Sequence, residues 1–365
     1  MVFANLMLCM SMTMLIPTVP AWLLYHEGLT TVETGLAMGA FGLGVFLPGP
    51  LCSYLVQRFR RNMVCVWSIL ALAVVTLIPV YITHIPFLWA VLLRGVQGMT
   101  YGLALIVLSS TLIIDTCESF QRTEANHSST WFGRFALSLG PTLGLLITQQ
   151  LDMKIVFWAS AVCCLLSALL IMLVHFPFRV PSDHVCKFSL DRFLLVQGWP
   201  LLLNFVPITI AVGMLLSLPL SLDYYAMMMI GFLMALLAQR FVFPDAELKS
   251  EIVSGLLLMM GGLLIMRFIP ASLLSSPLIG LGVGIMSTRF LLFFIKLSRH
   301  CQRGTAQSTF LMGWEVGLAL GIGLGFLFFE GAKELLLMCS LGIITVALVC
   351  YVLFTHNWFV ANKNR

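Results

Sequence analysis

Residues 63–82 read MVCVWSILALAVVTLIPVYI, an apolar run without a charged side chain. A bilayer's hydrocarbon core is about 30 Å thick, and a helix of roughly 20 apolar residues crosses it. The whole chain has the same character, since 60% of its 365 residues are hydrophobic, 10% are charged and the mean hydropathy is +1.02. A water-soluble domain needs more surface charge. The sequence therefore predicts an integral membrane protein.

Similar apolar runs, broken by short polar stretches, continue in both directions from this one. They are unbroken for about 20 residues, which favours helices over the alternating strands of about ten residues found in barrels. We predict an all-α polytopic membrane protein with 12 transmembrane helices. The expected spans are residues 3–24, 33–56, 63–82, 86–113, 125–149, 154–174, 198–218, 222–242, 250–269, 276–296, 305–329 and 335–355.

The longest polar stretch between spans follows the sixth. It includes Arg179, Asp183, Lys187 and Arg192. We expect residues 178–197 to form a central cytoplasmic loop. This loop would join an N-terminal six-helix bundle, residues 1–177, to a C-terminal six-helix bundle, residues 198–365.

An internal repeat supports two related halves. RTEAN at 122–126 is echoed by RGTAQ at 303–307, 181 residues later, and QRF at 57–59 returns as QRF at 239–241, 182 residues later. Each echo alone is weak. Together they align the fifth span with the eleventh and the second with the eighth, as a duplicated unit would.

Lysine and arginine are distributed unequally between the two sides of the predicted helices. One side holds 14 of them and the other only Lys154, Arg267 and Lys333. Because cytoplasmic loops retain the excess of basic residues, both termini are expected in the cytoplasm. The net charge of +5 reflects this bias and needs no nucleic-acid partner.

Three short motifs resemble those of the major facilitator superfamily. After the second span, QRFRRN at 57–62 is similar to the family's basic loop D-R-x-G-R-R, with Gln57 in place of the aspartate and Arg58 and Arg61 as its arginines. RGVQG at 94–98 matches R-x-x-Q-G in the fourth span. The resemblance implies two pseudo-symmetric six-helix bundles and a transporter that works by alternating access.

The third motif lies in the fifth span. Gly140, Pro141 and Gly144 are similar to the G-P-x-x-G core of a motif associated with antiporters. Small residues allow helices to approach closely, and proline removes one backbone hydrogen bond. Glycine packing without any bearing on transport direction is the alternative interpretation.

Charges inside the bilayer are costly and therefore mark functional candidates. Glu315 lies about ten residues into the eleventh span and Arg134 about ten into the fifth, at equivalent repeat positions. Glu315 is predicted to carry protons, to contact substrate or to pair with Arg134, or it is merely tolerated. Arg94 is interpreted as structural, gating or an anion anchor. Arg289 is either functional or extends its side chain towards the cytoplasm.

Asn5, Gln97 and Trp314 are candidates for lining a substrate cavity. Amide and indole groups are able to contact a solute there. A helix–helix hydrogen bond or a lipid-facing ring explains each of them equally well.

The sequence argues against an enzyme, because its seven histidines fall in loops or at span ends and offer neither a His/Asp pair nor a metal site. We predict a monomeric secondary active transporter in a bacterial inner membrane, without cofactor or metal. Its expected partners are a small-molecule substrate, protons and the lipid bilayer. Efflux by proton antiport is favoured, and facilitated or proton-symported uptake is the alternative. A non-transporting membrane sensor is the alternative outside this class.

Overall fold

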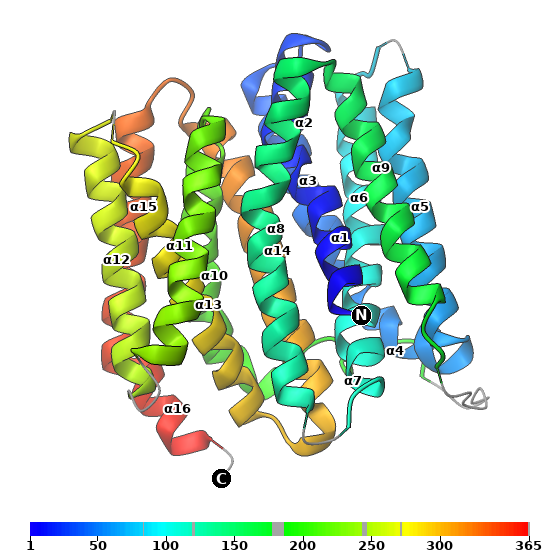
Figure 1. Ribbon diagram of the computed structural model, residues 1–365, viewed down its shortest axis with the longest axis vertical. Helices are drawn as coiled ribbons and strands as arrows, with labels where there is room; N and C mark the ends of the chain where they lie inside the picture. The colour runs from blue at the N-terminus through cyan, green and yellow to red at the C-terminus, as the bar shows by residue number, and fades with distance from the viewer. Residues whose placement is uncertain (83, 119–120, 177–185, 243–246, 271, 364–365) are drawn as a thin grey trace.

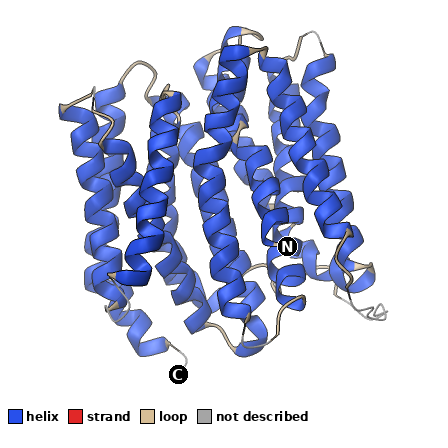
Figure 2. Ribbon diagram, in the orientation of Figure 1, coloured by secondary structure: helices blue, strands red, loops and turns tan. Residues whose placement is uncertain are grey.

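The computed structural model describes residues 1–82, 84–118, 121–176, 186–242, 247–270 and 272–363. Within these residues the regular structure is entirely helical (Figure 2). Both chain termini lie towards one end of the bundle, called here the lower end, where α4, α7 and α16 also lie (Figure 1).

The first half of the chain runs from α1 to α9. Its helices are α1 (Val2–Thr13), α2 (Leu15–Tyr25), α3 (Thr31–Phe46), α4 (Gly49–Arg58), α5 (Arg61–Tyr81), α6 (Phe87–Val107), α7 (Ile113–Asp115), α8 (Arg122–Gln150) and α9 (Met153–Met172), with a π-helical turn, η1 (Leu108–Leu112), between α6 and α7.

The second half runs from α10 to α16. Its helices are α10 (Trp199–Leu216), α11 (Leu222–Phe241), α12 (Leu248–Phe268), α13 (Ser275–Leu297), α14 (Arg303–Phe328), α15 (Lys333–Cys350) and α16 (His356–Asn362). Short turns η2 (Val196–Gly198) and η3 (His300–Gln302) precede α10 and α14, and η4 (Tyr351–Thr355) joins α15 to α16.

Most expected spans correspond to helices that can cross a membrane. Among the described residues, 10 continuous helices are long and apolar enough, and α3 with α4, bent by 43°, makes an eleventh if the two form one span. The expected fifth span is α8, which has 29 residues but begins with the polar run RTEANHSS and does not meet the same test. The helical membrane class is confirmed, and the count of 12 stays a prediction.

Local sequence explains where some helices begin and how closely they pack. At the start of α3, the Thr30 hydroxyl accepts from the backbone N–H of Glu33 at 3.2 Å, and the Glu33 carboxylate accepts from the N–H of Thr30 at 2.9 Å. On α8, a Cβ at Gly140 would clash with Thr13, and one at Gly144 with Met14. The G-P-x-x-G segment therefore packs against the junction between α1 and α2.

The largest contacts between the two halves come from two pairs of helices. α3 packs against α14, and α8 packs against α11. In the numbering of the expected spans these are pairs two–eleven and five–eight, which a two-fold axis relating the halves would interchange. Figure 1 shows α8 and α14 at the centre of the molecule, between the remaining helices of each half.

The lower end is closed by the described part of the expected central loop, residues 186–197. The backbone N–H of Ser189 donates to the carbonyl of Pro50 at 3.0 Å in the first half. The N–H of Leu195 donates to the Thr309 hydroxyl at 2.7 Å in the second half. Phe193 lies between these residues and is 1% exposed. Residues 177–185, which include Arg179 and Asp183, lie outside the described residues.

The upper end is closed by α3 and α14. The Thr31 hydroxyl donates to the Glu330 carboxylate at 2.6 Å. A Cβ at Gly35 would lie 2.7 Å from the carbonyl oxygen of Gly323. Any solute that reaches the centre of this bundle must therefore enter after one end has opened.

Candidate functional site

A small cavity lies between the halves. Residues of α1, α2, α3, α6, α8 and α14 line it, and its volume is about 40 Å³. Apolar walls come from Met12, Met38, Phe41 and Trp314, while Arg94 and Glu315 are the charged lining residues, with Thr13 and Cys9 beside them. This volume holds a few water molecules, whereas sites for drug-sized ligands measure roughly 300–1,000 Å³. The structure thus represents a closed form of the site.

Arg134 of the first half lies behind the cavity wall, against the neighbour of Glu315 in the second half. The Cζ atom of Arg134 lies 3.2 Å from the centroid of the Trp314 ring and 5.7 Å from that of Phe310. The Arg134 and Glu315 charges interact, yet among the described contacts no ion pair within 4.0 Å joins them. Aromatic faces, through cation–π attraction, therefore hold this guanidinium beside the carboxylate.

Two further titratable side chains face Glu315. Tyr101 on α6 and Cys9 on α1 both interact with its carboxylate. The Tyr101 hydroxyl also donates to the Cys9 Sγ at 3.7 Å. Glu315 itself is half-buried and lines the cavity, so it is accessible to any water or solute there.

Arg94, on α6, also lines the cavity. Its Nη1 donates to the Gln97 Oε1 at 2.8 Å, and the Gln97 Nε2 donates to the Thr76 hydroxyl at 3.3 Å. The Arg94 Cζ lies 4.7 Å from the centroid of the Phe41 ring. The three-residue spacing of the R-x-x-Q-G motif places both side chains on one helix face, so Gln97 orients Arg94.

The three candidate cavity residues have different positions. Trp314 lines the central cavity. Gln97 lines a smaller one of about 20 Å³ inside the first half, which Arg94 borders as well. Asn5 lines neither; its Nδ2 donates to the carbonyl of Ser129 at 3.0 Å and joins α1 to α8. A helix–helix hydrogen bond thus accounts for Asn5.

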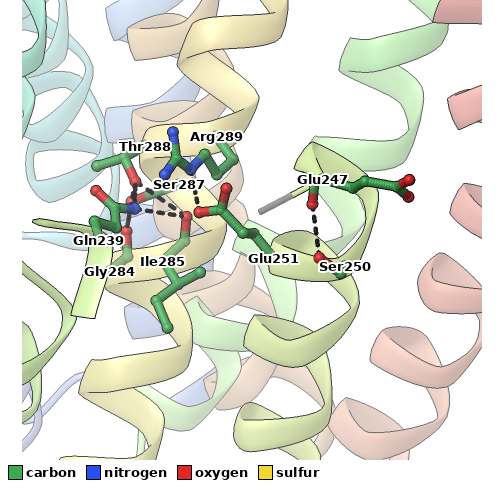
Figure 3. Close-up of polar contacts among 9 residues, drawn as sticks. All are labelled: Gln239, Glu247, Ser250, Glu251, Gly284, Ile285, Ser287, Thr288 and Arg289. Atoms are coloured by element: carbon green, nitrogen blue, oxygen red, sulfur yellow. Dashed lines mark hydrogen bonds and ion pairs between the residues drawn. The ribbon is translucent and has the colours of Figure 1, made fainter. Parts of the chain in front are cut away.

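Arg289 lies away from the central cavity and forms an ion pair with Glu251 (Figure 3). The Glu251 side chain is 1% exposed and that of Arg289 14%. Beside this pair, Gln239 donates to the Thr288 hydroxyl and to the carbonyl of Ile285 (Figure 3). Glu251 lies in the first turn of α12, near the start of the predicted ninth span, and is a buried acid that the sequence did not single out.

A related pair occurs in the first half. Arg61, the first residue of α5, forms an ion pair with Asp115, the last residue of α7. Glu251 near the start of α12 and Arg289 on α13 occupy the corresponding helices of the second half with the charges exchanged. Gln57 donates to the Ser53 hydroxyl at 2.9 Å.

The basic-loop motif thus lies at the lower end of the first half. Arg58 is the last residue of α4 and Arg61 the first residue of α5, so the motif spans the turn between these two helices. Asp115 was not singled out in the sequence, because it lies outside the three motifs quoted there. No group of three or more His, Cys, Asp or Glu side chains suited to a metal occurs in the described part of the chain.

Comparison with known proteins gives the family. The family model for the Major Facilitator Superfamily matches residues 1–322, so the chain belongs to this superfamily of membrane transporters. Among solved structures, it resembles the human organic anion transporter MFSD10 (TETRAN) with a TM-score of 0.70, covering 95% of this chain and 97% of that chain. Their sequences are 16% identical, so this likeness concerns the fold alone. No curated protein sequence matched.

Proposed function

We propose that this protein is a secondary active transporter that moves a small solute by alternating access and is coupled to protons through Glu315. The observation that carries this proposal is the position of Glu315. Among the described residues that line the cavity between the halves, it is the one carboxylate. A carboxylate withdrawn from water can exchange its proton as its surroundings change.

The closed ends of the bundle support alternating access. The α3–α14 contact closes the upper end, and residues 186–197 close the lower end. Each closure joins one half to the other, so rocking of the halves opens one end while the other stays closed. Glu315 then faces each side of the membrane in turn.

Two directions of coupling use the same carboxylate. Efflux in exchange for protons is the direction favoured by the G-P-x-x-G motif, and uptake together with protons is the alternative. Exchange requires the solute and the proton to compete for the cavity, whereas cotransport requires them to bind together. Organic anions, the class named for MFSD10, are one candidate class of solute.

The test uses everted membrane vesicles containing wild-type protein or Glu315→Gln. Lipophilic cations, sugars and organic acids are added in turn while the internal pH is recorded. Exchange makes acid-loaded vesicles release protons, and cotransport makes neutral vesicles take them up. In either case we expect Glu315→Gln to abolish the pH change.

Glu334→Gln is the matched control, because Glu334 lies at the upper end with a side chain 78% exposed. It should leave the pH change intact. Solute movement that is equal in wild type and Glu315→Gln, with no pH change in either, would show a facilitator and contradict the proton role. A solute that binds without crossing would instead indicate a sensor.

A further inference from the structure

We infer that the central cavity binds an organic anion and that this anion and a proton on Glu315 occupy the cavity together. The inference rests on the proposed function in taking Glu315 as the protonated group. It goes further by naming the charge of the substrate and the sign of its coupling to protons.

The first argument is the charge balance of the cavity region. Arg94 and Arg134 contribute two positive charges there, and Glu315 contributes one negative charge. Other buried charges have partners away from the cavity, as Arg289 has Glu251 at the lower end and Glu27 has His26 and His84 after α2. One positive charge near the middle of the bundle therefore lacks a counter-charge among the described residues. Such a charge is costly in a medium of low dielectric constant, and an anionic ligand compensates it.

The second argument is unused hydrogen-bonding capacity. Arg94 is 8% exposed and Arg134 2% exposed, and in both the buried Nε has no hydrogen-bond partner. Arg94 lines the cavity directly, while Arg134 lies against Trp314, which is part of the cavity wall. A guanidinium binds carboxylate and sulfonate groups through paired N–H donors. Arg94 is therefore the direct anchor, and Arg134 adds its positive field.

The third argument concerns the rest of the ligand. Phe41, Trp314 and Met38 provide aromatic and apolar wall surface next to Arg94. A hydrated inorganic anion has no apolar surface that could pack against these walls. An acid group on an aromatic or aliphatic body uses both parts of the site, as is usual for small-molecule pockets.

The same charges determine how a proton affects the ligand. Arg134 from α8, Tyr101 from α6 and Cys9 from α1 face Glu315, and Arg94 from α6 lines the same cavity. Protonation of Glu315 removes the negative charge and leaves both guanidinium groups to attract the anion. By linkage, the bound anion equally favours the protonated carboxyl group. A cationic solute would compete with the proton instead. An anionic substrate thus favours cotransport over exchange.

The experiment measures binding of three probes of matched shape to the full-length protein in lipid nanodiscs. They are 2-naphthoate, 2-naphthylmethylammonium and 2-naphthylmethanol. Isothermal titration in buffers of different ionisation enthalpy counts the protons taken up. We expect naphthoate to bind at least about tenfold more tightly than the ammonium probe, with net proton uptake.

Variants separate the roles of the charges. Arg94→Gln should weaken naphthoate binding about tenfold or more, and Arg94→Lys should restore part of it. Glu315→Gln, which resembles the protonated acid, should keep naphthoate binding but abolish proton uptake. Arg267→Gln removes a positive charge at the far end of α12 and should change nothing.

The inference is overturned if the ammonium probe binds more tightly, if naphthoate does not bind, or if Glu315→Gln loses naphthoate binding. These outcomes are distinct from failure of the proposed function. A Glu315-dependent pH change driven by a cation would refute the anion and keep the proton role. Naphthoate binding without any Glu315-dependent pH change in vesicles would refute the proton role and the joint occupancy, and would keep the anion site.

Discussion

Two regions of this protein hold buried charges, and they hold them in different ways. At the lower end of the second half, Arg289 and Glu251 form an ion pair in which each charge neutralises the other. In the central cavity, Arg134 lies on the face of Trp314 without a close ion pair to Glu315. Arg94 binds the neutral amide of Gln97.

The contrast separates charges that organise the bundle from charges that remain available. An ion pair that is already neutralised attracts a charged ligand only weakly, and removing one partner leaves the other as a buried, unpaired charge. A charge held by aromatic rings or an amide keeps its attraction for an ion of opposite sign. We therefore expect changes at Glu251 to affect stability and changes at Glu315 to affect transport.

The largest effect is expected from Glu315→Gln. Loss of the proton-exchanging carboxyl should reduce transport driven by a pH gradient by about 100-fold or more, as when a proton-transfer group is removed from other proteins. The thermal unfolding temperature in detergent should stay close to that of wild type. Equal gradient-driven uptake in both proteins would remove the functional distinction between the two regions.

Glu251→Gln should have the opposite profile. It leaves the Arg289 guanidinium largely buried without its counter-charge, which costs about 3–5 kcal/mol for a fully buried pair. Thermal and chemical unfolding of the purified protein measure the loss. The double variant Glu251→Leu with Arg289→Met should recover most of the stability, because no lone charge remains. Failure of this recovery would mean that the pair is not the cause.

Gly140→Ala tests how closely the helices around the cavity must pack. A Cβ at this position would clash with Thr13, so we expect a destabilisation of about 1–3 kcal/mol. The matched control is Gly261→Ala in α12, where an added Cβ meets nothing within 4 Å. This control should stabilise the helix by up to about 1 kcal/mol. Equal unfolding temperatures for the two variants would contradict close packing at Gly140.

Trp314→Leu should have the smallest effect. It removes the ring that faces the Arg134 guanidinium, a contact worth about 0.5–2 kcal/mol. Trp89→Leu is the control, since Trp89 is 60% exposed on the apolar surface. Unfolding should shift downward only for Trp314→Leu, and a larger shift for Trp89→Leu would argue that tryptophan loss itself is responsible.

Much of the architecture was predictable because bilayer thickness sets the length of an apolar helix. The span predicted at 63–82 corresponds to α5, and that at 154–174 to α9. α8 was harder to classify because its first two turns are polar. Some of those polar residues are shielded by the rest of the bundle, for example Asn126 and Ser129, which are buried. A hydropathy profile does not show which polar residues are shielded from lipid by neighbouring helices.

The candidate site was predictable only in part. Glu315, Arg134 and Arg94 could be identified because each is a charged residue within a predicted transmembrane span. Glu251 was missed because a carboxylate near the start of a predicted helix usually reaches water. Its burial depends on Arg289, which lies 38 residues later, and no local pattern links the two.

The sequence alone determined that this chain is a helical membrane protein with a repeated organisation. The length of its apolar runs, the distribution of its lysine and arginine residues, and the motifs repeated about 181 residues apart can all be read without knowing any tertiary contact. The tertiary structure decided which charges are neutralised and which face a cavity. That depends on the rotation and spacing of helices far apart in the chain. Arg134 contacts Trp314 because α8 and α14 both lie at the centre of the bundle. Asn5 instead donates a hydrogen bond to the backbone carbonyl of Ser129.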